Sequence, residues 1–306
     1  MAENKPKNKR ILYIAAGLII ISIFGLSSQF GTNGKIKSSG QTRKYLIYVP
    51  ESYDPDTKTP LVISIHGFVQ WPAHQQSMTG WNEVADENGF LVVYPKGTGF
   101  PLRWNTRPSD ENPGAMDEEL LFFSDLIEDL SLTYNIDPAR IYANGMSNGG
   151  GMSDLLACAF SDRIAAIGGV AGAYAQSRED CQPTHPMPVI AFHGLDDQIV
   201  NYQGGASSKD DDFVFPAIED WAAGWAEFNS CATTPETKVI TDEITQKHFT
   251  GCEENADVIL YSIEGAGHTW PGGEKLPVWI AGYTNQEINA SALMWEFFSK
   301  YSLEIE

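Results

Sequence analysis

A serine in the pentapeptide GMSNG, residues 145–149, matches the G-x-S-x-G pattern of an activated nucleophile. The pentapeptide follows an apolar segment, residues 140–143, and opens a glycine-rich segment with helical spacing. A strand, a sharp turn and a helix would hold the hydroxyl of Ser147 out at a sheet edge. They would also aim the backbone N–H of Asn148 at a developing oxyanion. The alternative interpretation is an ordinary strand-to-helix turn.

A serine hydroxyl is a weak nucleophile and needs a general base, and in this setting the chain order is serine, acid, histidine. His268 lies in a glycine-rich loop directly after the apolar segment 258–263, so it is the candidate base. His248 falls in a polar segment with no predicted strand before it, and we expect it at the surface. His185 lies between prolines in a loop that enters a strand.

The acid is expected in the loop after the penultimate strand, where the sequence offers Asp196 and Asp197. Either carboxylate could fix the tautomer of the imidazole and stabilise the imidazolium, and spacing alone does not separate them. His193, just before them, is expected to hydrogen-bond the loop. A second oxyanion donor is expected after the segment 61–65, and the backbone N–H of Phe68 is the candidate. An ordinary strand-ending turn is the alternative there.

The elements that must position these groups alternate along the chain after residue 40. Apolar runs predict strands at residues 45–49, 61–65, 90–94, 140–143, 164–170, 188–192 and 258–263. Helical spacing predicts helices at residues 80–88, 117–133, 149–160 and 285–301. Continuous apolar strands separated by helices indicate an α/β fold, with a mostly parallel central sheet and helices on both faces. Residues 31–306 are therefore expected to form one catalytic domain.

The first thirty residues have a different composition from the rest of the chain. A basic run before residue 11 is followed by an apolar stretch over residues 11–26 and then by small residues. This layout predicts a signal peptide or an N-terminal membrane anchor within residues 1–30, and hence a secreted, periplasmic or extracellular protein. A membrane contact is expected only through such an anchor.

An even number of cysteines after an export signal suggests two disulfides. Pairing of sequence neighbours is favoured among the three possibilities because it closes short loops. The pairs would be Cys158–Cys181 and Cys231–Cys252, and free buried thiols are the alternative. The spacing lacks the C-x-x-C pattern of a zinc site, so no metal is expected. The net charge of −20 argues against nucleic acid as a partner, because phosphate binding needs clustered basic residues.

Six motifs together resemble the polyhydroxybutyrate depolymerase and feruloyl esterase-like family of secreted α/β-hydrolases. They are HGF at 66–68, GWNEVAD at 80–86, FLVVYP at 90–95, GMSNGG at 145–150, FHGLDD at 192–197 and EGAGHTWPGG at 264–273. The resemblance implies an α/β-hydrolase fold, a triad of Ser147, Asp197 and His268, similarly placed cysteines, and no cofactor or metal. Gln198 stands where family members usually carry proline, so Asp196 stays as the alternative acid.

The expected activity is that of a serine esterase that forms an acyl-enzyme on feruloyl or acetyl esters of polysaccharide, or on short-chain esters. A polyhydroxybutyrate depolymerase, a serine peptidase and a non-catalytic binding relative are the alternatives. Trp71, Trp104 and Trp270 lie in loops near the predicted active edge. Their rings could stack on a cinnamoyl ring or a sugar, or hold an aliphatic polyester. Packing of the loops is the alternative role for these tryptophans.

Overall fold

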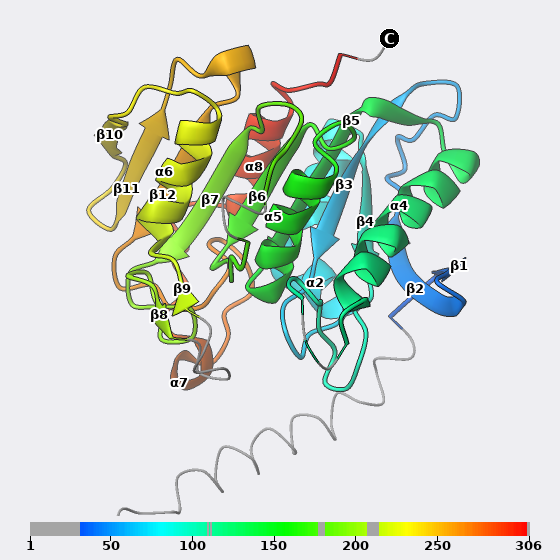
Figure 1. The fold of residues 1–306 in the computed structure, drawn as a ribbon, viewed down its shortest axis with the longest axis horizontal. Coiled ribbons are helices and arrows are strands. Elements are labelled where there is room, and N and C mark those ends of the chain that lie inside the picture. The colour runs from blue at the N-terminus through cyan, green and yellow to red at the C-terminus, as the bar shows by residue number, and fades with distance from the viewer. Residues whose placement is uncertain (1–30, 109, 111, 177–180, 207–213, 305–306) are drawn as a thin grey trace, which may run out of the picture.

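The computed structural model of the 306-residue chain describes residues 31–108, 110, 112–176, 181–206 and 214–304 (Figure 1). The segment predicted as a signal peptide or anchor, residues 1–30, lies outside this range. Within the described range, none of the helices has the length and apolar character needed to cross a membrane.

A ten-stranded sheet runs through the molecule. Its strands are β1 Gly34–Ser38, β2 Gln41–Tyr48, β3 Thr59–Ile65, β4 Leu91–Pro95, β5 Ile136–Met146, β6 Ala166–Val170, β7 Val189–Gly194, β10 Glu236–Val239, β11 Ile244–Phe249 and β12 Val258–Ile263. The spatial order is β1-β2-β4-β3-β5-β6-β7-β12-β11-β10. The six strands from β4 to β12 pair in parallel, and the antiparallel pairs lie at the two edges. The predicted mostly parallel sheet is confirmed.

Helices cover both faces of this sheet (Figure 1). They are α2 Pro72–Thr79, α3 Trp81–Asn88, α4 Ala115–Thr133, α5 Asn148–Ala159, α6 Ile218–Phe228 and α8 Ala290–Phe298. The short helix α7 Val278–Ala281 lies beyond the ends of the strands (Figure 1). Two further strands, β8 Gly205–Ala206 and β9 Val214–Phe215, form a separate ladder, and a short 3-10 helix spans Glu253–Asn255.

The alternation of side chains along the strands produces two separate hydrophobic cores. In β3, Leu61, Ile63 and Ile65 pack into the core that includes α4, α5 and α6. Val62, between them, packs into the other core, which includes α2, α3 and α8. Every residue of β3 is buried as a result, and this explains why the strand is a continuous apolar run in the sequence.

Several features differ from the sequence-based expectation. Helices α2 and α6 and strands β1, β10 and β11 were not predicted. His248 lies within β11, directly after the edge strand β10, rather than in a segment with no strand before it. Its side chain is half-buried and its Nε2 lies 2.7 Å from Asp257 Oδ2. Antiparallel strands near a sheet edge can keep polar residues, because one face meets water. Helix α8 begins at Ala290, not near residue 285, because the Asn289 side chain accepts a hydrogen bond from Ala292 N there.

Both predicted disulfides are formed: Cys158 pairs with Cys181, and Cys231 pairs with Cys252. The first joins the last turn of α5 to the segment that leads into β7. The second joins the residues after α6 to the residues after β11. Each bond therefore links segments that the sheet alone does not connect.

The disulfide between Cys231 and Cys252 closes a loop with a sequence separation of 21 residues. A cross-link that closes a loop of this length in the unfolded chain contributes about 3 kcal/mol to the free energy of unfolding. The double variant Cys231→Ser/Cys252→Ser should therefore lower the urea midpoint of unfolding under non-reducing conditions. Fully reduced wild-type protein is the matched control and should unfold at a still lower urea concentration. Equal midpoints for the variant and the oxidised wild type would contradict a stabilising role.

Candidate active site

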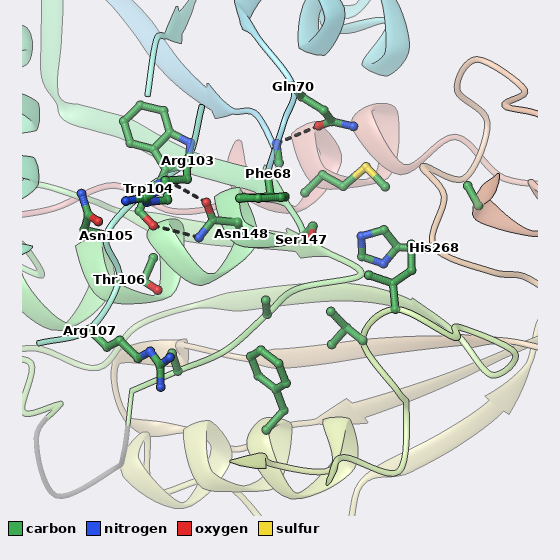
Figure 2. A pocket seen from close by; sticks show the side chains of 18 of the residues that line it. Phe68, Gln70, Arg103, Trp104, Asn105, Thr106, Arg107, Ser147, Asn148 and His268 are labelled. Atoms are coloured by element: carbon green, nitrogen blue, oxygen red, sulfur yellow. Dashed lines mark hydrogen bonds between the residues drawn. The ribbon is translucent and has the colours of Figure 1, made fainter. Parts of the chain in front are cut away.

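A pocket of about 650 Å³ opens at the carboxyl ends of the parallel strands. Loops that follow β3, β5, β6, β7 and β12 all contribute to its wall. Ser147 and His268 both line it, although 121 residues of sequence separate them, and Figure 2 shows them in the same view of the pocket. The topology therefore gathers the predicted nucleophile and the predicted base at one sheet edge.

Ser147 stands between β5 and α5 with φ of 55° and ψ of −119°, a conformation that non-glycine residues rarely adopt. Its N–H donates to the Val170 carbonyl at 2.9 Å. Its own carbonyl accepts from Gly151 N at 3.0 Å and from Ala173 N at 2.9 Å. These three backbone hydrogen bonds, one to the last residue of β6 and one to the segment after it, hold the strained turn in place.

The two glycines of the pentapeptide are required by close backbone approach. A Cβ on Gly149 would lie 2.1 Å from the Ile65 carbonyl oxygen, and a Cβ on Gly145 would lie 2.3 Å from the Gly149 backbone. Helix α5 therefore begins directly against the ends of β3 and β5. Only glycine at both positions allows this packing, which sets where the Ser147 side chain stands.

His268 and Asp197 form a buried hydrogen-bonded pair. His268 Nδ1 lies 2.7 Å from Asp197 Oδ2, and the two residues are 8% and 1% exposed. Because an ionised carboxylate only accepts, Nδ1 carries the proton and Nε2 of the neutral ring is left as an acceptor. Asp196 is exposed, and its backbone N–H donates to the Ala266 carbonyl. Of the two aspartates, Asp197 makes the hydrogen bond to His268.

The carboxylate of Asp197 has further donors. Its Oδ1 accepts from the backbone N–H groups of Ile199 at 2.8 Å and Val200 at 2.9 Å. His193 Nε2 lies 2.9 Å from the Val200 carbonyl and 3.4 Å from Asp197 Oδ2, so its N–H points mainly at the carbonyl. Burial would raise the pKa of Asp197, but the hydrogen bonds from His193 and His268 outweigh it and keep that pKa well below its usual range. The expectation that His193 hydrogen-bonds this loop is confirmed.

The predicted oxyanion residues Phe68 and Asn148 line the pocket beside Ser147 (Figure 2). The turn that carries Phe68 is closed by Gln70, whose Oε1 accepts from Gly67 N at 2.7 Å. Asn148 is the first residue of α5, where backbone N–H groups have no partner inside the helix. The structure therefore brings both residues to the nucleophile.

Sequence reasoning missed what the Asn148 side chain does. Its Oδ1 accepts from Trp104 N at 2.7 Å and its Nδ2 donates to the Trp104 carbonyl at 3.0 Å. The Trp104 indole N–H in turn donates to the His66 carbonyl at 2.9 Å. These bonds tie residues 103–107, a wall of the pocket, to the nucleophile turn. No sequence signal identifies a pairing across such a long loop.

The three tryptophans lie at different distances from the pocket, and Trp104 is the one of them that lines it. Trp270 is 1% exposed, its indole N–H donates to Ser291 Oγ at 3.2 Å, and it packs in the core that includes α8, so it does not line the pocket. Trp71 precedes α2 with its ring against His74, also outside the lining. Trp104 lines the pocket but is only 2% exposed. Of the three, Trp270 belongs to the hydrophobic core, and Trp104 contributes to the pocket wall while its indole N–H is held by the His66 carbonyl.

The remaining walls of the pocket come from residues that sequence reasoning did not select. The apolar part is Ile199, Val200, Phe215, Leu276 and Ile280, and the polar part includes Arg103, Asn105, Thr106 and Arg107. Within the described part of the chain, no group of three or more His, Cys, Asp or Glu side chains is arranged to hold a metal ion.

Comparisons with known proteins place the chain among esterases. The family model described as Esterase PHB depolymerase matches residues 43–203. Feruloyl esterase B of Piromyces equi is 29% identical over 239 residues, which cover 76% of this chain and 44% of that protein. The bifunctional acetylxylan esterase/xylanase XynS20E of Neocallimastix patriciarum is 27% identical over 246 residues, covering 79% and 33%. The chain thus spans less than half the length of these two relatives.

A solved structure shows the same fold. The acetyl xylan esterase from Aspergillus awamori superimposes with a TM-score of 0.57 at 15% identity, covering 77% of this chain and 93% of that one. Together with the sheet order and the helices on both faces, this likeness confirms the predicted α/β-hydrolase fold.

His66 gives a test of the buried hydrogen-bond arrangement. Its Nε2 accepts from Gly97 N at 3.0 Å, which requires the proton on Nδ1, beside the Gly67 carbonyl. Complete burial lowers the pKa of His66 to about 4. Long-range ¹H–¹⁵N NMR should therefore show a neutral ring with the proton on Nδ1 at about pH 5.

The lowered pKa of His66 makes the stability of the fold depend on pH. The unfolded chain binds a proton at His66 near the ordinary pKa of about 6.5, whereas the folded chain binds it only near pH 4. The free energy of unfolding therefore falls as the pH drops from about 6.5 to about 4. A His66 signal that titrates near pH 6.5 in the folded protein would contradict the arrangement.

Proposed function

The chain belongs to the Esterase PHB depolymerase family, and from this premise we propose that it is a serine esterase that hydrolyses carboxylic esters through an acyl-enzyme. The observation that carries the proposal is the buried pair of His268 Nδ1 and Asp197 Oδ2, 2.7 Å apart, in the pocket that also contains the strained Ser147. A nucleophile at a strained turn and an oriented base are the parts that acyl transfer needs.

In the proposed cycle, Ser147 Oγ attacks the ester carbonyl while His268 Nε2 takes the hydroxyl proton. Asp197 stays ionised, because its pKa lies well below its usual range, and it stabilises the imidazolium that forms. The alcohol then leaves with the proton from His268. Water, activated by the same nitrogen, hydrolyses the acyl-enzyme and regenerates Ser147.

The proposed oxyanion donors are the backbone N–H groups of Phe68 and Asn148. The position of Asn148 at the start of α5 supports this role, because the N-terminus of a helix favours negative charge. Loss of one such donor typically raises the barrier by about 2.7–4 kcal/mol. The bonds from the Asn148 side chain to Trp104 would keep the donor group in place during the reaction.

The proposed substrates are feruloyl or acetyl esters of polysaccharide, or short-chain esters. Support comes from the two relatives, whose names are feruloyl esterase and acetylxylan esterase/xylanase. The second candidate is a polyhydroxybutyrate polymer or oligomer, which the name of the family model favours. The mixed wall of the pocket, apolar on one part and polar on the other, is compatible with either kind of ester.

We propose that the protein works outside the cytoplasm, secreted or held by an N-terminal anchor. Support comes from the two disulfides, which form and persist in oxidising compartments. The basic and apolar pattern of residues 1–30 also supports export.

The nucleophile is tested with Ser147→Ala on 4-nitrophenyl acetate and butyrate, methyl ferulate, acetylated xylo-oligosaccharides and 3-hydroxybutyrate oligomers. We expect the wild type to cleave at least one ester and the variant to fall to background, because the variant lacks the hydroxyl that forms the acyl-enzyme. The ranking of esters then separates the polysaccharide and polyester candidates. Full activity of the variant, or cleavage of a matched amide with no ester cleaved, would refute the esterase proposal.

The acid is tested with Asp197→Asn, and Asp196→Asn is the matched control one residue away. The asparagine at 197 can donate to His268 and so favours the wrong tautomer, which should lower kcat by about 10³- to 10⁴-fold. Asp196→Asn should lower it less than about threefold, because this side chain is exposed and lies outside the hydrogen-bonded pair. The reverse order of the two effects would assign the acid to Asp196.

A further inference from the structure

Asp154 is a buried acidic side chain that the proposed reaction does not use. It lies in α5, the helix that begins directly after Ser147, and it is fully buried. Its Oδ1 accepts hydrogen bonds from two indole N–H groups of α6, Trp225 Nε1 at 2.9 Å and Trp221 Nε1 at 3.1 Å. One carboxyl oxygen therefore joins the nucleophile helix to α6.

A carboxyl group is not needed at this place to hold the two helices together. Taking it out of water costs free energy, and apolar groups of the same shape often pack with equal stability. Apolar contacts do not fix how an indole ring is turned, whereas a hydrogen bond to its single N–H does. The side chain of Asp154 therefore sets the orientation of Trp221 and Trp225 relative to α5.

The ring of Trp221 reaches the segment that supports the nucleophile. It stacks on the ring of Tyr174, with the centroids 3.5 Å apart and the planes 4° apart. The Tyr174 ring also lies against the backbone of Gly169 and Gly172, where a Cβ would collide with it. Because Tyr174 is buried among these groups, its position depends on that of Trp221.

The residue before Tyr174 holds the backbone of the nucleophile. Ala173 N donates to the Ser147 carbonyl at 2.9 Å, and Ala173 also lines the pocket. The segment that begins at Ala171 is itself strained, since the φ of Ala171 is 47°. Strain of this kind persists only where the surroundings hold it, so the segment needs a support of its own. The stack of Tyr174 on Trp221 supplies that support.

We propose that Asp154 is a positioning residue for the nucleophile. By orienting Trp221, it fixes the ring of Tyr174. The adjacent Ala173 N–H then stays where it holds the carbonyl of Ser147. This inference rests on the proposed esterase function and adds a residue to it. Loss of the orientation displaces the serine hydroxyl but leaves the base and its acid in place.

The test compares two tryptophans that donate to the same oxygen. Trp221→Phe and Trp225→Phe each remove one indole N–H from Asp154 and leave an aromatic ring in its place. Trp221 stacks on Tyr174, whereas Trp225 meets Phe228 of its own helix edge to face. For 4-nitrophenyl acetate, Trp221→Phe should therefore lower kcat about 10- to 100-fold and Trp225→Phe less than about threefold.

Three readouts separate positioning from a loss of stability. The value of kcat is expressed per active site titrated to completion with a fluorophosphonate, so unfolded protein does not count. The pH profile of kcat/KM should keep its wild-type shape, because His268 and its hydrogen bond to Asp197 are not displaced. The urea midpoints of the two phenylalanine variants should be similar, because each variant has lost the same kind of hydrogen bond.

Asp154 itself is tested with a conservative and an apolar replacement. Asp154→Asn keeps an oxygen that can accept from both indoles and should retain most of the wild-type kcat. Asp154→Leu removes both hydrogen bonds and should lose at least as much activity as Trp221→Phe. If Asp154→Leu does not fold, the two phenylalanine variants still decide the question.

The proposed function and this inference can fail separately. A wild type that neither hydrolyses 4-nitrophenyl acetate nor reacts with the fluorophosphonate would remove the basis for both. If the wild type is active, equal kcat per titrated site in Trp221→Phe and Trp225→Phe would overturn the role of Asp154. A wild-type kcat in folded Asp154→Leu would overturn it as well.

Discussion

The backbone contact between the start of α5 and the ends of β3 and β5 is the constraint on which the rest of this site depends. It leaves no room for a side chain at Gly145 or Gly149, and it forces Ser147 into a backbone conformation with positive φ. Strain of this kind costs on the order of 1–3 kcal/mol and persists only where the surroundings hold it. Here the end of β6 and the segment after it supply that support through hydrogen bonds to the Ser147 backbone.

Electrostatics then determine how the site works once the serine is in place. Asp197 is buried, yet two backbone N–H groups and His268 satisfy its oxygens, so the carboxylate remains ionised and holds one tautomer of the imidazole. The loop after β7 thus supplies a fixed negative charge on one side of His268. On the opposite side of the pocket, the side chain of Asn148 holds the loop of residues 103–107 through two hydrogen bonds to the Trp104 backbone. Hydrogen bonds therefore fix the loops on both sides of the nucleophile.

The parallel strands of the central sheet, Ser147 and His268 could be predicted from the sequence, because local patterns specify them. Buried parallel strands are continuous apolar runs, and the nucleophile turn has glycines at fixed offsets. What escaped prediction depends on contacts that are distant in sequence or on water at one face. Strand β11 keeps polar residues because it lies near the sheet edge. Trp270 lies two residues after His268, but its indole turns into the core toward Ser291. The spacing alone left Asp196 and Asp197 equal; the family resemblance implied Asp197, and the fold shows that its carboxylate meets His268.

The central claim is that Ser147 is a nucleophile activated by its surroundings and not merely a residue at a tight turn. The most direct measurement is labelling of the native protein with a fluorophosphonate, followed by mass spectrometry of its peptides. The account predicts one stoichiometric adduct, located on the peptide that contains Ser147, and no adduct after the protein is unfolded in urea. Absence of labelling in the native protein, or an adduct on another residue, would contradict it.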